Sequence, residues 1–194
     1  MNNYNNTTIS SGIQQIDALL NGGFHKGDLS IIATMPDINK TAYANQLASS
    51  SATIVNVPAI INKSGITTKD IKELIITRNA DAIFIDCLEL ITPKENRESL
   101  LEETSDIAFE LRKIAEDSQV AIICFSQLSK NEKGQFPDLE YPLPTEIEQE
   151  ASVIISLSRS ECSDDKNNPH IDLIIAKNKY GSIGTISSMV LGIT

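Results

Sequence analysis

Short apolar runs alternate with amphipathic segments along most of this chain. Strands are predicted where the apolar residues are continuous, short and rich in β-branched side chains. Helices are predicted where apolar residues recur every three or four positions, as they do at 13, 16, 19 and 20. A strand that is apolar on both sides must be covered on both faces. The pattern therefore predicts an α/β fold with a mostly parallel central sheet and helices on both of its faces.

The predicted elements follow one another in a regular order. Helices are expected over 13–20, 41–49, from 66 onward after a threonine cap, and over 97–117, and strands over 29–34, 53–57, 82–86, 120–125 and 153–157. The first helix is expected to end at Gly22-Gly23, and the helix over 97–117 to bury apolar residues at 100, 101, 107, 108, 111 and 114. Segments 171–176 and 184–190 flank Lys177-Asn-Lys-Tyr-Gly, which predicts an antiparallel C-terminal hairpin.

Length and charge limit the classes of protein. With 194 residues, 41% of them hydrophobic, we predict a flexible tail over 1–8 and a single domain over 9–194. A net charge of −10 argues against a broad surface for DNA or anionic membranes. No run of 18 apolar residues occurs, so we expect a cytoplasmic protein without a membrane partner. Cys87 and Cys124 lie in apolar runs and are interpreted as reduced core thiols.

The stretch from Leu29 to Ser50 has the layout of a phosphate-binding loop. A β-branched run leads into a turn at Pro36, and Lys40-Thr41 open an Ala-rich helical segment. In the motif G-x-x-x-x-G-K-[ST], the lysine reaches the outer phosphates and the hydroxyl holds magnesium. The stretch therefore predicts a phosphate-binding site with magnesium, although an ordinary strand, turn and helix would show the same pattern.

Both glycines of that motif are replaced in this chain by Thr34 and Asn39. Asparagine tolerates positive φ, so the loop can still form. Asp37 places a carboxylate where an anion would bind. The candidate nucleotide-binding residues are Thr34, Pro36, Asn39, Lys40 and Thr41.

Polar residues also end the neighbouring predicted strands. Asp86 ends strand 82–86, and Ser126-Gln127 follow strand 120–125. Ligands of parallel sheets bind at the carboxyl ends of the strands, so these side chains are expected near Lys40. Thr41 and Asp86 form a candidate magnesium pair, since an aspartate on the strand beside a phosphate loop commonly holds this ion. A simple turn acid is the alternative interpretation of Asp86.

Six segments in a fixed order extend this pattern over nearly the whole chain. They are Ile9-Ser-Ser-Gly-Ile, Gly27-Asp-Leu, Ile85-Asp-Cys-Leu-Glu-Leu-Ile, Phe125-Ser-Gln-Leu-Ser, Glu148-Gln-Glu-Ala-Ser and Ile174-Ile-Ala-Lys-Asn-Lys-Tyr-Gly. Together they resemble the C-terminal motor domain of the DnaB-type hexameric replicative DNA helicases. The resemblance implies a RecA-like P-loop NTPase fold, ATP and magnesium as ligands, a role in DNA replication, and a sensor-like catalytic role for Gln127.

The chain also departs from the family pattern. The family carries a strand tipped by a water-activating glutamate between its phosphate-loop helix and its aspartate strand, and no acid-tipped strand is recognisable between Lys40 and Asp86. The resemblance implies that Lys177 and Lys179 are the candidates for trans-acting fingers, with a lysine where the family uses arginine. We also expect the family's ring-forming N-terminal domain and linker helix to be absent. We therefore expect a degenerate ATP site with weak or absent hydrolysis.

Three hypotheses about function remain open at this point. The first is a nucleotide-binding protein of DNA replication, derived from a helicase and feeble in hydrolysis. The second is an interaction module that binds no nucleotide and docks on a replicative helicase or another replication protein. The third is an active ATP-dependent helicase motor. The segment 129–142 carries two lysines against three acids, which predicts weak or no binding of single-stranded DNA and a monomer or weak oligomer.

Overall fold

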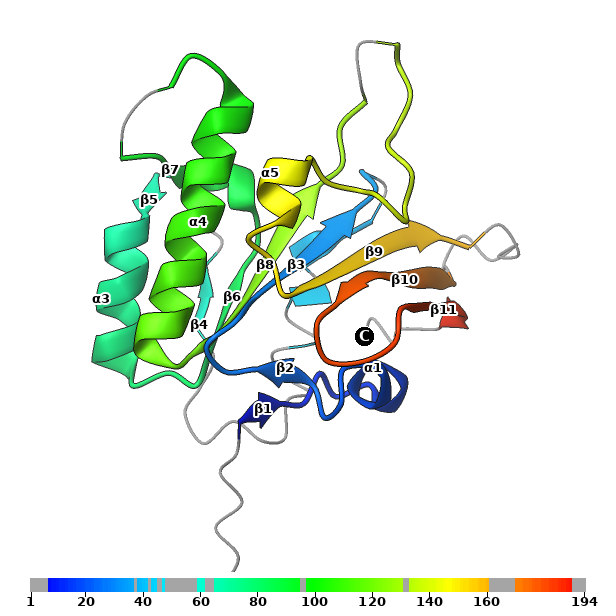
Figure 1. Cartoon of the computed structure of the whole chain (residues 1–194), viewed down its shortest axis with the longest axis horizontal. Coiled ribbons are helices and arrows are strands. Elements are labelled where there is room, and N and C mark those ends of the chain that lie inside the picture. The colour runs from blue at the N-terminus through cyan, green and yellow to red at the C-terminus, as the bar shows by residue number, and fades with distance from the viewer. Residues whose placement is uncertain are drawn as a thin grey trace, which may run out of the picture.

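A seven-stranded sheet forms the centre of this computed structural model, which describes residues 7–36, 38–41, 43–44, 47, 59–61, 65–94, 97–130, 133–160 and 170–189. Within the described residues its strands run in the order β11-β10-β9-β3-β8-β6-β4 (Figure 1). Their bounds are β3 Leu29–Thr34, β4 Ala59–Ile61, β6 Ala82–Ile85, β8 Ala121–Gln127, β9 Val153–Arg159, β10 Ile171–Asn178 and β11 Gly184–Met189.

Parallel pairing joins the strands from β4 to β9, and β10 and β11 extend the sheet beyond β9 in antiparallel pairs. The predicted α/β fold with a mostly parallel sheet and a C-terminal antiparallel hairpin is therefore confirmed. The predicted strand 53–57 lies outside the described residues. The sheet edge next to β6 is instead formed by β4, which the apolar pattern did not single out.

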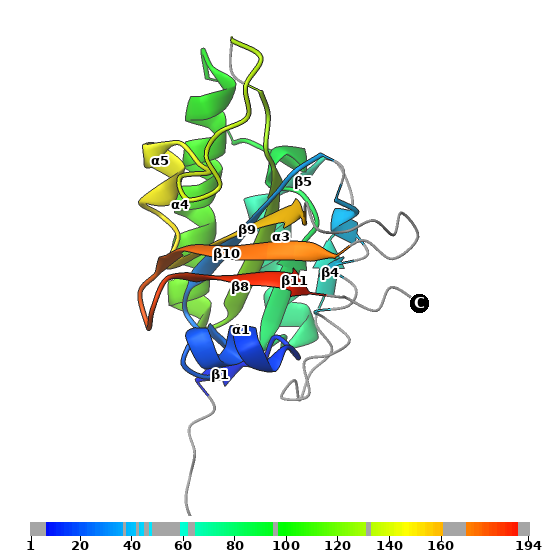
Figure 2. The same ribbon diagram turned by 90° about the vertical axis from the view of Figure 1, so that its right-hand side faces the viewer.

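Helices cover both faces of the sheet. Their bounds are α1 Gln14–Leu19, α3 Thr68–Arg78, α4 Leu100–Ser118 and α5 Thr145–Glu148, with a 3₁₀ turn, η1, over Leu88–Leu90 and helical residues 40, 41, 43, 44 and 47 after β3. Two short ribbons complete the elements: β1 Thr8–Ile9 with β2 Phe24–His25, and β5 Ile66–Thr67 with β7 Ile91–Thr92. Figure 2 shows α4 and α5 together on one side of the sheet.

Alternate side chains of the central strands build two separate cores. In β8, Ile123 and Phe125 join a cluster with α1 and the helix after β3, whereas Ile122 and Cys124 join a cluster with α3 and α4. All four side chains are fully buried. Because successive strand residues point to opposite faces, a continuous apolar run satisfies both cores at once. The continuous apolar pattern therefore predicted the layers of the fold correctly.

The structure shortens the predicted helix 97–117 at its start. The helix α4 begins at Leu100, since the Ser99 side chain accepts a hydrogen bond from the Glu102 amide (3.2 Å) and caps it. Leu100 and Leu101, predicted to face the core, are exposed instead. The buried positions of α4 begin at Thr104 and continue through Ala115, so its first turn projects past the apolar contacts of the core.

The Asp17 carboxylate stabilises the segment that precedes β3. Asp17 on α1 accepts hydrogen bonds from the Ser11 amide and hydroxyl (both 2.7 Å) and from the Ser10 hydroxyl (2.5 Å). The predicted helix end at Gly22-Gly23 is corrected, because the helix stops at Leu19 and Asn21 already has a left-handed φ of 55°. The ribbon β1–β2 begins at Thr8, inside the segment predicted as a tail.

Candidate functional site

The carboxyl ends of β3, β8 and β6 meet at one edge of the sheet. Thr34, the last residue of β3, lies opposite Gln127 of β8, and Ile85 of β6 lies opposite Cys124. Because β6, β8 and β3 are parallel neighbours, the residues that follow them are brought together. This edge therefore gathers the candidate residues from three separate parts of the chain, as the sequence predicted.

Lys40 points to the end of β8. Its Nζ donates a hydrogen bond to Gln127 Oε1 (2.8 Å) and lies 3.4 Å from Cys87 Sγ. Lys40 opens the helical residues after β3, so its position follows from the strand, loop and helix order. The structure thus brings the candidate phosphate-binding lysine to the candidate sensor glutamine.

Thr41 and Asp86 form the second contact across this edge. The Thr41 hydroxyl donates to Asp86 Oδ2 (2.8 Å). The other carboxylate oxygen, Oδ1, is buried and has no hydrogen-bond partner among the described residues. An orphaned carboxylate oxygen beside a hydroxyl fits a hard cation, because magnesium prefers oxygen ligands. The residues present therefore fit the predicted magnesium pair.

Glu89 also enters the site, although its direction was unpredictable from sequence. Its Oε1 accepts hydrogen bonds from the Ser126 hydroxyl (2.6 Å) and from the backbone amide of Gln127 (3.2 Å). Its Oε2 accepts from the Cys87 thiol (2.7 Å). The 3₁₀ turn η1 directs Glu89 back toward β8. A single 3₁₀ turn is too short to show a hydrophobic period, so the sequence pattern could not predict this direction.

Cys87 is not the core thiol that its apolar neighbours predicted. It is only half-buried at this edge, while Cys124 is fully buried in β8. Burial, together with the hydrogen bond and charge of Glu89, raises the pKa of the Cys87 thiol to about 11. The thiol is therefore protonated at neutral pH and acts as a hydrogen-bond donor rather than a nucleophile.

The loop between β3 and the helix is defined at its two ends. Thr34 is fully buried, and its hydroxyl lies 3.4 Å from the Ser126 carbonyl oxygen to which it donates. Pro36 and Asn39 are exposed, and Asp37 lies outside the described residues. In the described part of the chain, positive φ among non-glycine residues occurs at Asn21, Asn79 and Gln119. Asn39 therefore does not use the left-handed conformation for which asparagine was considered suitable.

Lys177 and Lys179 lie at the opposite end of the sheet, near the amino ends of its parallel strands. Lys177 on β10 pairs with Ile154 near the amino end of β9, whereas the site of Lys40 lies at the carboxyl ends of the parallel strands. Lys177 Nζ donates to the Glu148 carbonyl oxygen (2.7 Å), and Lys179 Nζ lies 3.5 Å from Asp28 Oδ1. Both lysines therefore contact residues of the same chain, and they lie away from its candidate nucleotide site.

Asp28 anchors the hairpin turn that carries Lys179. It accepts hydrogen bonds from the Tyr180 and Ser152 hydroxyls. The Tyr180 ring also stacks on His25, with ring centroids 3.4 Å apart. Burial and the hydrogen bond to Asp28 raise the pKa of the Tyr180 hydroxyl, which therefore remains a donor. The turn is fixed against the β2 and β3 end of the domain.

Gly181→Ala is expected to destabilise the domain by about 1–3 kcal/mol, the usual cost of overpacking a closed contact. A Cβ at this position would lie 2.3 Å from the Leu19 carbonyl oxygen. Gly184 belongs to the same hairpin, but a Cβ there would meet no atom within 4 Å, so Gly184→Ala serves as the control and should change little. Urea unfolding of both variants measures the difference, and equal free energies of unfolding would contradict this packing.

In the described part of the chain, no helix has both the length and the apolar character needed to cross a membrane.

Comparison with known proteins relates this arrangement to replicative helicases. Residues 51–192 match the family model of the DnaB-like helicase C terminal domain. The probable plasmid replicative DNA helicase of Chlamydia psittaci is 33% identical over 117 residues, which cover 58% of this chain and 26% of that protein. The replicative DNA helicase DnaC of Bacillus subtilis is 26% identical over 251 residues, which cover 93% of this chain and 54% of that protein. The chain thus spans about half the length of the Bacillus subtilis helicase and about a quarter of the length of the Chlamydia psittaci protein.

A solved structure shows the same fold. It is that of a DnaB-like replicative helicase studied for its interactions with primase, and it superposes with a TM-score of 0.74 at 20% identity. The match covers 93% of this chain and 59% of that one. The alignment with the Bacillus subtilis helicase runs over 251 positions, more than the 194 residues present here, so the corresponding segment of that helicase is longer. This chain therefore has the fold of that helicase structure and is shorter than the segment of the Bacillus subtilis helicase that it matches.

Proposed function

The chain belongs to the family of DnaB-like helicase C-terminal domains, and from this premise we propose that it binds ATP with magnesium at the carboxyl edge of its sheet. We further propose a role in DNA replication with a degenerate site whose hydrolysis is weak or absent. Lys40 would contact the outer phosphates, and Thr41 and Asp86 would hold the magnesium ion. Gln127 would contact the same phosphates from β8.

One observation carries this proposal. Lys40 meets Gln127 at 2.8 Å and Thr41 meets Asp86 at 2.8 Å, so four residues from three segments converge at one sheet edge. The orphaned Asp86 Oδ1 adds an acceptor that a cation would satisfy. Magnesium, when bound, would neutralise part of the phosphate charge.

Weak hydrolysis is proposed on two grounds. The family positions a water-activating glutamate between the phosphate-loop helix and the aspartate strand, and here Asp86 follows Lys40 by only 46 positions. Glu89, the acid that does reach the site, is already engaged by the Ser126 hydroxyl, the Gln127 amide and the Cys87 thiol. A carboxylate engaged by three donors is poorly placed to accept a proton from water.

The trans-acting positions support the same proposal. A lysine keeps the charge of an arginine finger but lacks its planar fork of donors. Lys179 is moreover paired with Asp28, whose side chain is mostly buried, so moving it to a neighbouring subunit would break that pair. Lys177 and Lys179 therefore make a weaker finger pair than a lysine and an arginine would.

Calorimetric titration with ATP and magnesium tests the proposal directly. Wild-type protein is expected to bind, and Asp86→Asn is expected to weaken the binding in the presence of magnesium more than in its absence. The isosteric change keeps an acceptor for the Thr41 hydroxyl while removing the negative charge that a cation needs. Absence of heat and of any competition with a fluorescent ATP analogue would reject nucleotide binding.

A second function, docking on a replicative helicase or another replication protein without nucleotide, is favoured by one feature of the site. Lys40 already donates to Gln127 and Thr41 to Asp86, so these hydrogen-bonding groups are occupied without a ligand. The same titration separates the two functions, because only the first requires binding of ATP.

Weak binding of single-stranded DNA is expected from the charge of the loop after β8. In this family such loops contact DNA, and here Asp138 and Glu140 stand among the described residues of the loop beside Lys130 and Lys133. With few phosphate contacts, we expect no binding tighter than about 10 µM at physiological salt. Fluorescence anisotropy on a labelled oligonucleotide measures this, and sedimentation checks the expected monomer or weak oligomer. Submicromolar binding with a steep salt slope, or a stable hexamer, would contradict the expectation.

A further inference from the structure

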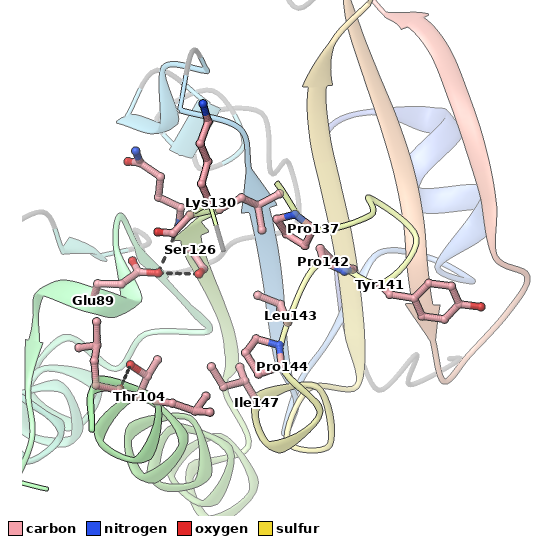
Figure 3. Close-up of a pocket in the computed structure, with 15 residues that line it drawn as sticks. Glu89, Thr104, Ser126, Lys130, Pro137, Tyr141, Pro142, Leu143, Pro144 and Ile147 are labelled. Atoms are coloured by element: carbon pink, nitrogen blue, oxygen red, sulfur yellow. Dashed lines mark hydrogen bonds between the residues drawn. The ribbon is translucent and has the colours of Figure 1, made fainter. Parts of the chain in front are cut away.

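An apolar groove of about 440 Å³ lies beside the candidate nucleotide site. Its walls are the first turn of α4 and the segment that leads into α5, and its floor is the end of β8 (Figure 3). The apolar lining residues are Leu100, Leu101, Leu128, Pro137, Tyr141, Pro142, Leu143, Pro144 and Ile147. Glu89, Ser126 and Gln127 line the end nearest the candidate site. The groove is therefore apolar along most of its length and polar at one end.

Exposed apolar side chains are concentrated around this groove. Seven large hydrophobic side chains are exposed in the described part of the chain, and three of them line the groove: Leu100 (68%), Leu101 (40%) and Tyr141 (71%). Single exposed leucines are common on protein surfaces, but several around one hollow are typical of an interaction site. The first turn of α4 projects past the core and carries two of these side chains together.

Acidic residues adjoin the apolar lining in the 137–147 segment and at the polar end of the groove. Asp138, Glu140 and Glu146 are next in sequence to lining residues of that segment, and Glu89 lines the polar end. Among the described residues that line the groove, Lys130 is the one cation, and it stacks over the Phe136 ring. The rim of the groove therefore carries more acids than bases along the 137–147 segment and at its polar end.

We propose that this groove binds a basic, amphipathic segment of a partner polypeptide. Its apolar side chains would fill the lining between α4 and the 137–147 segment, and its lysines or arginines would pair with the acids of the rim. Charge complementarity selects this occupant. Nucleic acid is disfavoured because phosphates would meet carboxylates, and a second copy of this chain is disfavoured because both copies carry a net charge of −10.

The test uses three fluorescent probes with the full chain. The first is a helical peptide of repeated Leu-Lys-Lys-Leu, the second has glutamate in place of every lysine, and the third is an oligo(dT) strand. Anisotropy should detect salt-dependent binding of the basic peptide alone. Methyl NMR should place that binding in the groove, through shifts of the Leu101, Leu143 and Ile147 methyl groups. These methyl groups are internal to the proposed site and report contact directly.

Two matched variants connect the binding to the groove. Leu100→Lys removes an apolar contact and adds a repelling charge, and Leu100 is so exposed that the fold should tolerate the change. It should weaken the basic peptide by at least about tenfold, the usual effect of losing one buried leucine contact. Ile76 on α3 is similarly exposed (70%) but lies outside the groove lining, so Ile76→Lys should leave the affinity unchanged.

Each contrary result has a definite meaning. No binding of the basic peptide at about 100 µM, a concentration that reveals weak peptide sites, overturns the proposal. Equal binding of the acidic peptide, or equal loss in Leu100→Lys and Ile76→Lys, overturns it as well, because the contact would then be unspecific. Binding of oligo(dT) with shifts of the same methyl groups would assign the groove to nucleic acid instead.

Discussion

Lys40→Ala is expected to reduce the affinity for ATP and magnesium by at least about a hundredfold, to the point that calorimetry detects no binding. The Lys40 ammonium is the cation that the described residues place at the carboxyl edge of β3, β6 and β8, 2.8 Å from Gln127. Phosphate oxygens lose their charge-assisted partner when it is removed. Removal also leaves Gln127 without its donor, but both groups are accessible to water, so stability should change little.

The matched control is Lys69→Ala. Lys69 is an exposed lysine on α3 and lies outside the candidate site, so its removal changes the net charge equally without touching the phosphates. Thermal unfolding of both variants shows whether the fold is intact. If wild-type protein binds ATP and Lys40→Ala binds it equally well, the nucleotide occupies another place and the roles proposed for Thr41, Asp86 and Gln127 fail together.

The layers of the fold were predictable because burial on both faces leaves a strong trace in the sequence. Strands β3, β6, β8 and β9 are continuous apolar runs, and each was predicted to within two residues at its ends. The edge strand β4 was not predicted because Ala59–Ile61 is short and follows a proline in the sequence.

The convergence of Lys40, Asp86 and Gln127 was predictable for a different reason. Each follows a parallel strand directly, and the carboxyl ends of parallel strands share one edge of the sheet. The position of Glu89 was not predictable, since a 3₁₀ turn just beyond Asp86 sets its direction. Periodicity carries no information on such a turn, and the hydrogen bonds of Glu89 to β8 join residues distant in sequence.

The error at the start of α4 has the same origin. Leu100 and Leu101 fit the helical period of the buried face, so periodicity assigned them to the core. Their exposure follows from how far the helix extends beyond the sheet, and the hydrophobic pattern does not contain that length. Such a mismatch between an apolar pattern and an exposed position points to an interaction surface, as at the groove between α4 and the 137–147 segment.

Wild-type protein is expected to hydrolyse ATP at least about a thousandfold more slowly than a full-length replicative helicase assayed in parallel. A missing general base typically costs about 10²–10⁴-fold and a missing arginine finger about 10³–10⁵-fold, so the combined loss exceeds either one. The variant Glu89→Gln tests directly whether Glu89 acts as a general base. In Glu89→Gln the amide oxygen can still accept from the Ser126 hydroxyl and the Gln127 backbone amide, and only the hydrogen bond from the Cys87 thiol is lost. Phosphate release at saturating ATP, with and without single-stranded DNA, measures the rates.

Glu89→Gln should leave any residual rate within about twofold of wild type, because a carboxylate that only holds β8 and η1 together contributes no proton transfer. Robust hydrolysis that DNA stimulates, and that Glu89→Gln abolishes while ATP affinity is retained, would contradict this. Glu89 would then be the general base, with its bonds to Ser126 and Cys87 broken when nucleotide binds. The site would then be that of a working motor in which an acid after β6 does the work of the family's glutamate.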